Sequence, residues 1–355
     1  MGTAASRADE GRGARSVRAL IVVVTLRGGL ALGVAPRAWR SGGGRRQTLR
    51  HAADGDKGML KIAFQGEHGA YSEEAAYQHF GASIETLPLP SFEAVFSAVE
   101  SGLASYGMLP MENSQAGSIN KSHDLLLEYD LRVHGETTLR VRHALMALPA
   151  EAGKETVPLT TVRSHPQALA QCERYILANA LQIEAGADTA GSAREIADGQ
   201  IRGVGAICSV LAASRYGLEV VAYGIEDYEY NFTRFFVLGK GDAATPTKIP
   251  KTSVAFAVVD KPGALCAALD EFGKRKVNLI KLESRPRRRT VAPGFNYVFF
   301  ADFEGSLTDE PCSEAIMGLL GSCAFVKLLG SFEAAPPAAS SLSEGATLDP
   351  TLMQI

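Results

Sequence analysis

The sequence predicts an α/β protein with two domains. Short apolar runs alternate with amphipathic stretches over residues 60–238, which is the pattern of βαβ units with mostly parallel strands. A second pattern follows over residues 252–329 in the order βαββαβ, which is the ferredoxin-like arrangement. The length of 355 residues and the hydrophobic content of 46% are sufficient for two domains with complete cores.

The first domain is expected to consist of two similar α/β lobes. Strands are predicted, in order, over residues 60–64, 106–109, 139–148, 160–162, 204–207 and 235–238. Helices are predicted over residues 70–80, 92–100, 119–129, 166–180, 190–198 and 209–216. Ser91 is the expected cap of the second helix, and Gly, Ser or Pro mark the junctions.

The second domain follows a linker rich in Gly, Pro, Thr and Lys. Its predicted strands are 252–259, 278–283, 296–303 and 325–329, and its predicted helices are 263–276 and 310–320. The resulting boundaries are 1–57 for a leader and linker, 58–240 for the first domain, 241–251 for the linker, 252–332 for the second domain and 333–355 for a disordered tail.

The N-terminal segment has the composition of a transit peptide. Residues 1–50 hold ten Arg, no Lys and only two acids, together with many Gly, Ala and Ser. Arg27 ends the one apolar run too early for a membrane span, so no membrane helix is expected. A short secretory signal and a loose myristoylation pattern at Gly2 are the alternatives to organelle import.

The overall charge and the cysteines exclude several classes of protein. The net charge of -3 gives no drive toward nucleic acid or a membrane surface. Five widely spaced cysteines contain no C-x-x-C pair, which indicates reduced thiols rather than zinc ligands or a disulfide framework. The histidines also lack metal-binding spacing, so no metal is expected.

Polar turns supply the candidate site. The run from Asn231 to Phe235 places a hydroxyl and a guanidinium between aromatic rings, which suits the binding and protonation of a small anion. Ser114, Ser164 and Thr189 lie in turns before predicted helices, where unpaired backbone N–H groups bind carboxylates. For each turn alone a helix cap is the favoured interpretation, and the run alone is equally well explained as a strand edge.

Taken together, these segments resemble one enzyme family. The segments are Gly66 to Glu73, Pro110 to Ser114, Ser164 to Cys172, Asp188 to Ala190 and Thr233 to Phe235, in this order. Their order and spacing resemble the prephenate and arogenate dehydratases over residues 60–332. The resemblance implies a two-lobed catalytic domain like a periplasmic binding protein and an ACT regulatory domain. Met111 and Ser192 depart from the family pattern.

The resemblance implies loss of water and carbon dioxide from prephenate or arogenate without a cofactor. Thr233 is expected to donate a hydrogen bond to the leaving oxygen, with Asn113 or Ser114 as a relay. Expected substrate-binding residues are Arg234, Thr189, Ser164, Gln167 and Phe235. Glu112 is expected to be paired rather than catalytic, because a free carboxylate would repel a dianion. His165 is the rival acid, although a structural role at its helix start is favoured.

The resemblance also implies phenylalanine as an allosteric effector. Its expected contacts are Gly263, Ala264, Leu265, Asn278, Glu283, Ser284, Arg285 and Pro286. A tight turn followed by a charged loop is the alternative for these segments.

The expected protein is a plastid dehydratase that prefers arogenate and forms a homodimer or homotetramer. The expected preference for arogenate rests on the N-terminal composition and on the likeness to plastid members of the family. A non-catalytic two-lobed binding protein, or an amino-acid sensor with a vestigial first domain, is the alternative. Intact Thr233, Arg234 and Asn113 argue against the second of these.

Overall fold

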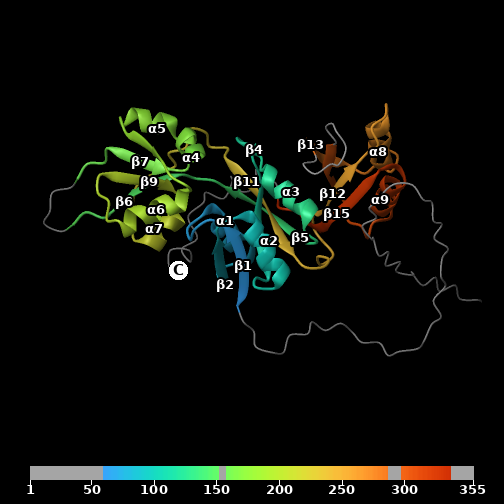
Figure 1. Ribbon diagram of the computed structural model, residues 1–355, viewed down its shortest axis with the longest axis horizontal. Coiled ribbons are helices and arrows are strands. Elements are labelled where there is room, and N and C mark those ends of the chain that lie inside the picture. The colour runs from blue at the N-terminus through green and yellow to red at the C-terminus, as the bar shows by residue number, and fades with distance from the viewer. Residues whose placement is uncertain (1–58, 152–156, 287–296, 337–355) are drawn as a thin grey trace, which may run out of the picture.

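The computed structural model describes residues 59–151, 157–286 and 297–336. The expected leader over 1–57 and most of the tail over 333–355 lie outside these ranges. Three bodies follow one another along the long axis of the molecule, with the second lobe at one end and the ferredoxin-like domain at the other (Figure 1). Within the described ranges, no helix combines the length and apolar character that crossing a bilayer requires.

The first lobe is a mixed sheet with helices on both faces. Its strands are β1 (Leu60–Gln65), β2 (Ile84–Leu89), β3 (Tyr106–Asn113), the short β4 (Gly117–Ser118), β5 (Arg132–Arg140) and β11 (Phe232–Gly239). Its helices are α1 (Tyr71–Phe80), α2 (Phe92–Ser101) and α3 (Asn120–Glu128). The sheet order is β5-β11-β3-β1-β2, with β1 parallel to β2 and β3, and β11 antiparallel to β3 and β5.

Local sequence sets the ends of α2 as predicted. The Ser91 hydroxyl oxygen accepts a hydrogen bond from the Ala94 N–H at 3.2 Å, which satisfies one of the unpaired groups at the helix start. Gly102 ends the helix in the left-handed region with φ 82°, where a side chain is disfavoured. Between these ends, Val95, Phe96 and Val99 are fully buried against the sheet.

The second lobe has its own sheet. Its strands are β6 (Ala144–Ala147), β7 (Thr161–Ser164), β8 (Gln182–Ala185), β9 (Val204–Cys208) and β10 (Glu219–Tyr223), in the order β10-β6-β9-β7-β8. Its helices are α4 (Pro166–Gln171), α5 (Glu173–Ala178), α6 (Thr189–Asp198) and α7 (Val210–Tyr216). The chain passes between the lobes twice, from β5 to β6 and from β10 to β11, which is the two-lobed arrangement predicted.

Two predicted elements are wrong in this region. The strand expected over 139–148 is two strands in different sheets, because residues 141–143 pass between the lobes and the Val141 N–H donates to Asn231 O. The helix expected over 166–180 breaks at Cys172. The connector between the lobes causes this break: the Asp227 N–H donates to the Gln171 carbonyl, and the Asp227 carboxylate accepts from the Arg174 N–H.

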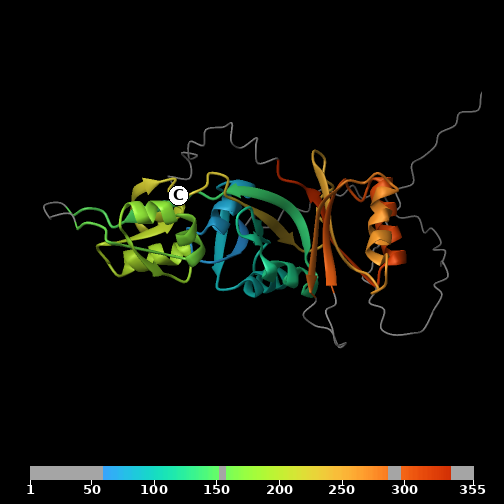
Figure 2. The ribbon, with the colours of Figure 1, turned by 90° about the horizontal axis from the view of Figure 1, so that it is seen from above.

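The ferredoxin-like domain has the predicted βαββαβ order. Its elements are β12 (Pro250–Ala257), α8 (Ala264–Gly273), β13 (Leu279–Pro286), β14 (Tyr297–Glu304), α9 (Glu310–Ser322) and β15 (Phe325–Glu333). The antiparallel sheet has the order β13-β14-β12-β15. Helices α8 and α9 cover the face that points away from the first lobe (Figure 2). The opposite face contacts α3 of the first lobe, where the rings of His123 and Phe300 meet edge to face at 4.9 Å.

Strand β15 joins the two sheets into one. It runs parallel to β5 through the pair Glu333 and Gly135, so the sheet continues from the first lobe into the ferredoxin-like domain. Lys327 of β15 donates to the Tyr129 carbonyl at 2.7 Å beyond the end of α3, where a cation is favourable. Burial lowers the pKa of Lys327 to about 8.

Gly330 allows β15 to approach β5 closely. A Cβ atom at this position would lie 2.3 Å from the Val133 carbonyl oxygen, and the backbone there cannot rotate away. We expect Gly330→Ala to lower the free energy of unfolding by about 1–3 kcal/mol, measured by urea denaturation. Gly321→Ala is the control, because its Cβ meets nothing within 4 Å in α9 and should be neutral or stabilising. Equal stability of the two variants would contradict a close contact at Gly330.

Candidate active site

Thr233 and Asn113 form the centre of the candidate site. They face each other across β11 and β3, and their exposed fractions are 9% and 8%. The Asn113 Nδ2 group donates to the Thr233 Oγ1 atom at 3.0 Å. The Asn113 Oδ1 atom accepts from the N–H groups of Gln115 and Ala116 at 3.0 and 2.9 Å. Thr233 Oγ1 therefore serves as an acceptor within the protein, and its own proton has no acceptor among the described residues.

Ser114 has a different set of partners from the one predicted. Its hydroxyl donates to the Tyr230 carbonyl at 3.0 Å and accepts from the Phe232 N–H at 3.0 Å. Both bonds hold the connector from β10 to β11 against the end of β3. The predicted relay from Ser114 to Thr233 is therefore not formed, whereas the contact from Asn113 is.

Arg234 lies on the opposite face of β11, because side chains alternate along a strand. Its guanidinium is 2.8 Å from Glu112, 3.1 Å from Glu136 and 2.7 Å from Asp302 of the ferredoxin-like domain. It also stacks over the Phe236 ring at 5.0 Å. Three carboxylates thus occupy the group that was expected to hold a substrate carboxylate. The expectation that Glu112 is paired is confirmed by its contacts with Arg234 and Lys281.

The ion pairs around Arg234 determine the charge of their members. Burial alone would raise the pKa of Asp302, but Arg234 and Ser253 hold that pKa below its ordinary value. Burial would lower the pKa of Arg234, and the three carboxylates raise it instead. Asp302 and Arg234 are therefore ionised at neutral pH. These ion pairs connect Arg234, which follows Thr233 in β11, to the ferredoxin-like domain.

The structure gives two of the other predicted binding residues a structural role. Ser164 is fully buried and its hydroxyl donates to the Ile207 carbonyl at 2.6 Å. Phe235 is 1% exposed and packs in the core between α1 and the sheet, because alternation turns it inward. These two assignments are corrected. Thr189 is half-buried at the first turn of α6, and Gln167 is exposed in the first turn of α4.

His165 is positioned as a helix cap. Its Nδ1 atom accepts from the Gln167 N–H at 3.2 Å, and Pro166 follows it as the first residue of α4. This agrees with the structural role that was favoured over a rival general acid.

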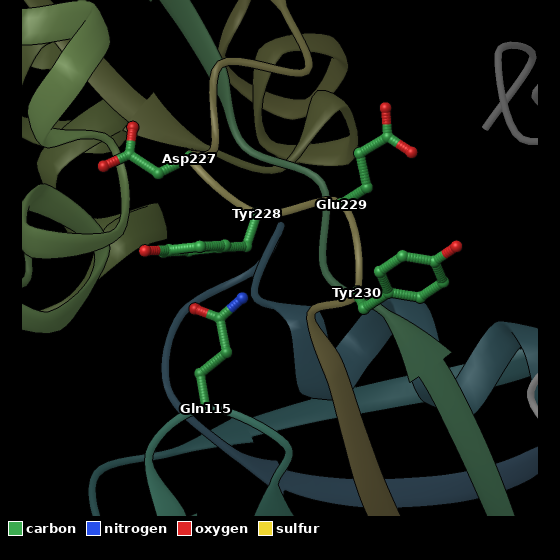
Figure 3. Close-up of a pocket in the computed structure, with 5 residues that line it drawn as sticks. All are labelled: Gln115, Asp227, Tyr228, Glu229 and Tyr230. Atoms are coloured by element: carbon green, nitrogen blue, oxygen red, sulfur yellow. The ribbon is translucent and has the colours of Figure 1, made fainter.

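A cavity of about 560 Å³ lies beside the connector from β10 to β11. It is lined by Gln115, Asp227, Tyr228, Glu229 and Tyr230. Figure 3 shows Gln115 reaching from the turn after β3 toward the Tyr228 ring, opposite the connector that carries the other four residues. The Gln115 N–H is bonded to Asn113, so the cavity wall and the donor pair are parts of one hydrogen-bonded unit. A second cavity of about 390 Å³ is lined by Asn113 and Ser114 as well as by Glu112 and Arg234.

Three polar residues to which the sequence analysis gave no role extend the site: Gln171, His143 and Tyr71. Asn231 Nδ2 donates to Gln171 Oε1 at 3.1 Å, and His143 Nε2 lies 2.9 Å from the same oxygen. The hydroxyl of Tyr71 lies 2.8 Å from His143 Nδ1. Gln171 and Tyr71 each fall within a segment that carries the family resemblance, but only the fold brings His143 between them.

Glu74 also lies on α1, one turn from Tyr71. Burial raises its pKa to about 7, so this carboxyl changes charge near neutral pH. Tyr71 keeps its proton, because burial raises its pKa well above the ordinary value.

The predicted effector residues divide into two groups. Glu283 and Arg285 face the first lobe: Ser118 donates to the Glu283 carboxylate at 2.7 Å, and Arg285 lies 3.1 Å from Asp124. The other group lies at the surface or next to it. Gly263 has φ 79° before α8, Ala264 and Leu265 are half-buried, and Asn278, Ser284 and Pro286 are exposed.

The comparisons with known proteins agree with this architecture. The family model for prephenate dehydratase matches residues 62–243. An Arabidopsis thaliana protein, arogenate dehydratase/prephenate dehydratase 2, chloroplastic, is 41% identical over 280 residues, covering 77% of this chain and 72% of that protein.

Two solved structures extend the likeness over both domains. GqqA, described as a quorum quenching acylase, has a TM-score of 0.70 at 33% identity and covers 78% of this chain and 98% of its own. The prephenate dehydratase of Arthrobacter aurescens, solved with L-Phe, has a TM-score of 0.68 at 28% identity and covers 82% and 99%.

The fold and the site define a two-lobed α/β enzyme that carries a buried hydroxyl and amide pair at the junction of its lobes and a ferredoxin-like domain beyond them. The chain belongs to the prephenate dehydratase family. It is an arogenate/prephenate dehydratase of phenylalanine biosynthesis, a carbon–oxygen lyase. The predicted family, fold class and reaction are confirmed.

Proposed function

We propose that Thr233 donates the hydrogen bond that assists departure of the substrate hydroxyl. In the reaction the bond to the ring carboxylate breaks, its electron pair enters the ring, and the C–O bond breaks as hydroxide leaves with a hydrogen bond from Thr233. A proton from solvent converts the hydroxide to water. Aromatisation drives these steps, so a well-placed donor is sufficient. The observation that carries the proposal is the bond from Asn113 Nδ2 to Thr233 Oγ1, which leaves the hydroxyl proton for the substrate.

The first turn of α6 is the proposed site for a substrate carboxylate. The N–H groups of Thr189 and Ala190 have no partner within their helix, and the helix dipole favours an anion there. This assignment replaces the clamp by Arg234, whose guanidinium already contacts three carboxylates. Gln167, exposed at the start of α4, is the second proposed contact on the same lobe.

Arogenate is the proposed main substrate. Arogenate carries an ammonium group where prephenate carries a ketone. The cavity beside the connector is lined by the exposed Glu229 and by Asp227, which is paired with Arg174. The Glu229 carboxylate attracts the ammonium group and gives no such attraction to the ketone. The Arabidopsis relative is named for both substrates, so the charge of the cavity wall is what supports this preference.

Phenylalanine is the proposed effector of the ferredoxin-like domain, which we assign as an ACT domain. The turn at Gly263 and the exposed end of β13 are the proposed contacts, and the Arthrobacter relative solved with L-Phe supports this choice. Glu283 and Arg285 would then transmit binding to the first lobe through Ser118 and Asp124. We further propose a homodimer or homotetramer and import into plastids, the latter supported by the Arg-rich leader and the chloroplastic relative.

Thr233→Val tests the donor. It keeps the shape of the side chain and removes the hydroxyl, so kcat should fall roughly 10²- to 10⁴-fold with little change in KM. Thr233→Ser should keep much of the rate. Thr138→Val, in the neighbouring strand β5, is the matched control and should change kcat by less than about threefold. Steady-state rates on arogenate and prephenate measure this, and an unchanged rate in Thr233→Val would exclude the role.

Glu229→Gln tests the basis of substrate preference. Loss of the carboxylate should lower kcat/KM for arogenate about 3- to 10-fold and leave the value for prephenate unchanged or higher, because only arogenate presents a cation. Glu219→Gln, which removes an exposed carboxylate of β10, is the control. An equal fall in kcat/KM for both substrates would show that Glu229 does not distinguish the ammonium group from the ketone.

Gly263→Val tests the effector site. A branched side chain at φ 79° is strained and would occupy the turn, so inhibition by phenylalanine should weaken more than about tenfold at unchanged basal rate. Gly217→Val carries a similar strain at φ 64° in the second lobe, where a Cβ meets nothing within 4 Å. Equal sensitivity of the two variants to phenylalanine would contradict the assignment.

A further inference from the structure

A chain of polar side chains connects Thr233 to the first helix of the first lobe by way of the second lobe. We name it the polar chain, and its members are Thr233, Asn113, Asn231, Gln171, His143 and Tyr71. Successive contacts are 3.0, 2.7, 3.1, 2.9 and 2.8 Å. Asn231 and His143 are 0% and 2% exposed, so water does not compete for their bonds.

The direction of the hydrogen bonds in the polar chain begins at the backbone. Two N–H groups, of Gln115 and Ala116, point at one atom of the Asn113 amide, which must therefore be its oxygen. The other atom is the NH₂ group, which has two protons. Three oxygens accept from this group: Asn231 Oδ1 at 2.7 Å, Thr233 Oγ1 at 3.0 Å and, at the longest distance of 3.2 Å, the Phe232 carbonyl. The two shorter contacts, to Asn231 and Thr233, belong to the polar chain.

The same reasoning fixes each following group. Because Asn231 Oδ1 accepts from Asn113, the Asn231 Nδ2 group must be the donor to Gln171 Oε1. That single oxygen also contacts His143 Nε2 at 2.9 Å. An oxygen without a proton requires a donor, so His143 must carry its proton on Nε2.

The remaining nitrogen of His143 is then an acceptor. Tyr71 donates to His143 Nδ1 at 2.8 Å, which is shorter than its 3.1 Å contact with the Arg142 carbonyl. A doubly protonated ring, with Tyr71 donating to Arg142 instead, would also satisfy the geometry. Burial lowers the pKa of His143, however, and so favours the neutral ring.

We propose that His143 and Gln171 are positioning residues for catalysis. They hold Asn231 in the orientation that presents its oxygen to the Asn113 NH₂ group, and so reinforce the Asn113 orientation that leaves the Thr233 hydroxyl as a donor to the substrate. This inference rests on the proposed role of Thr233. If Asn113 presented an oxygen to Thr233, that oxygen would take the hydroxyl proton and the leaving group would receive none. The positioning residues touch no reacting atom and act through the direction of hydrogen bonds.

The polar chain also spans both passages between the lobes. His143 lies on the passage from β5 to β6, Asn231 lies on the passage from β10 to β11, and Gln171 belongs to α4 of the second lobe. The orientation of the Thr233 hydroxyl therefore depends on the position of the second lobe relative to the first. An apolar contact between the lobes could provide the same packing, but it could not fix the direction of the hydrogen bonds in the polar chain.

Nitrogen NMR of the full chain, labelled with ¹⁵N histidine and without substrate, tests the direction of the bonds. His143, assigned from the spectrum of His143→Gln, should show one protonated nitrogen, Nε2, and one bare nitrogen, Nδ1. Asn231→Asp should reverse this, since its carboxylate cannot donate and Gln171 must turn to present its NH₂ group to His143. A ring protonated on Nδ1 in the parent protein would overturn the proposal, whatever the rates of the variants.

Kinetics then test the consequence. His143→Leu, which lacks a donor, should lower kcat about tenfold with less than a twofold change in KM. His143→Gln keeps an N–H group near the position of Nε2 and should retain more than about a third of kcat. Equal rates for the two variants, whether high or low, would contradict a role through bond direction.

Asn113→Asp gives a second test that does not depend on His143. Its second oxygen would accept the proton of Thr233, so the variant should lose about as much kcat as Thr233→Val. The double variant should lose no more than either single variant. Additive losses would overturn the proposal, whereas full activity of Thr233→Val would instead remove the proposed function on which it rests.

Discussion

The alternation of side chains along β11 is the constraint on which the two functions of this protein depend. Thr233 and Arg234 are consecutive, so a strand must send them to opposite faces of the sheet. One face meets α1 and the junction of the lobes, where Thr233 is paired with Asn113. The other face meets the ferredoxin-like domain, where Arg234 is paired with Asp302. Catalysis and contact with the proposed regulatory domain are thus separated by one peptide bond.

Hydrogen bonds on the catalytic face contribute direction as well as stability. A buried polar group must find partners, and amides satisfy this requirement in only one of two orientations once a backbone N–H has selected the oxygen. The Asn113 side chain meets two such N–H groups, so its orientation is set before any ligand binds. Preorganised donors of this kind need no rearrangement during the reaction, which is where much of their effect on rate arises.

Local patterns predicted the fold class, whereas the resemblance to one enzyme family predicted the pair of Thr233 and Asn113, which are 120 residues apart. Apolar periodicity located most strands and helices, and the turn chemistry at Ser91 set a helix start that the structure confirms. Sequence patterns failed where the chain passes between the lobes. The strand predicted over 139–148 and the helix predicted over 166–180 are each divided by contacts with residues far along the chain. Strand β8 was missed because its residues are exposed and lack the apolar run of a buried strand.

The candidate site was predicted only in part for a similar reason. A motif shows which residue types are adjacent, but not which face of the strand each occupies, so Arg234 was placed beside Thr233. The periodicity of two along a strand already argued for opposite faces and could have corrected this. The roles of His143 and Tyr71 could not have been found this way, because about 70 residues separate them in the sequence and only the passage between lobes brings them together.

The ion pairs beneath Arg234 also limit how freely the two domains can be exchanged among relatives. The first lobe contributes Glu112, Glu136 and Arg234 and so carries an excess negative charge, while Asp302, Lys251 and Lys281 give the other side an excess positive charge. A foreign domain without those lysines would leave Glu136, whose side chain is 3% exposed, short of a cation. Breaking a buried pair of this kind costs roughly 3–5 kcal/mol. The two domains have separate folds, but their charges at this contact are complementary. A chimera must therefore keep the carboxylates of the first lobe together with the lysines of the ferredoxin-like domain.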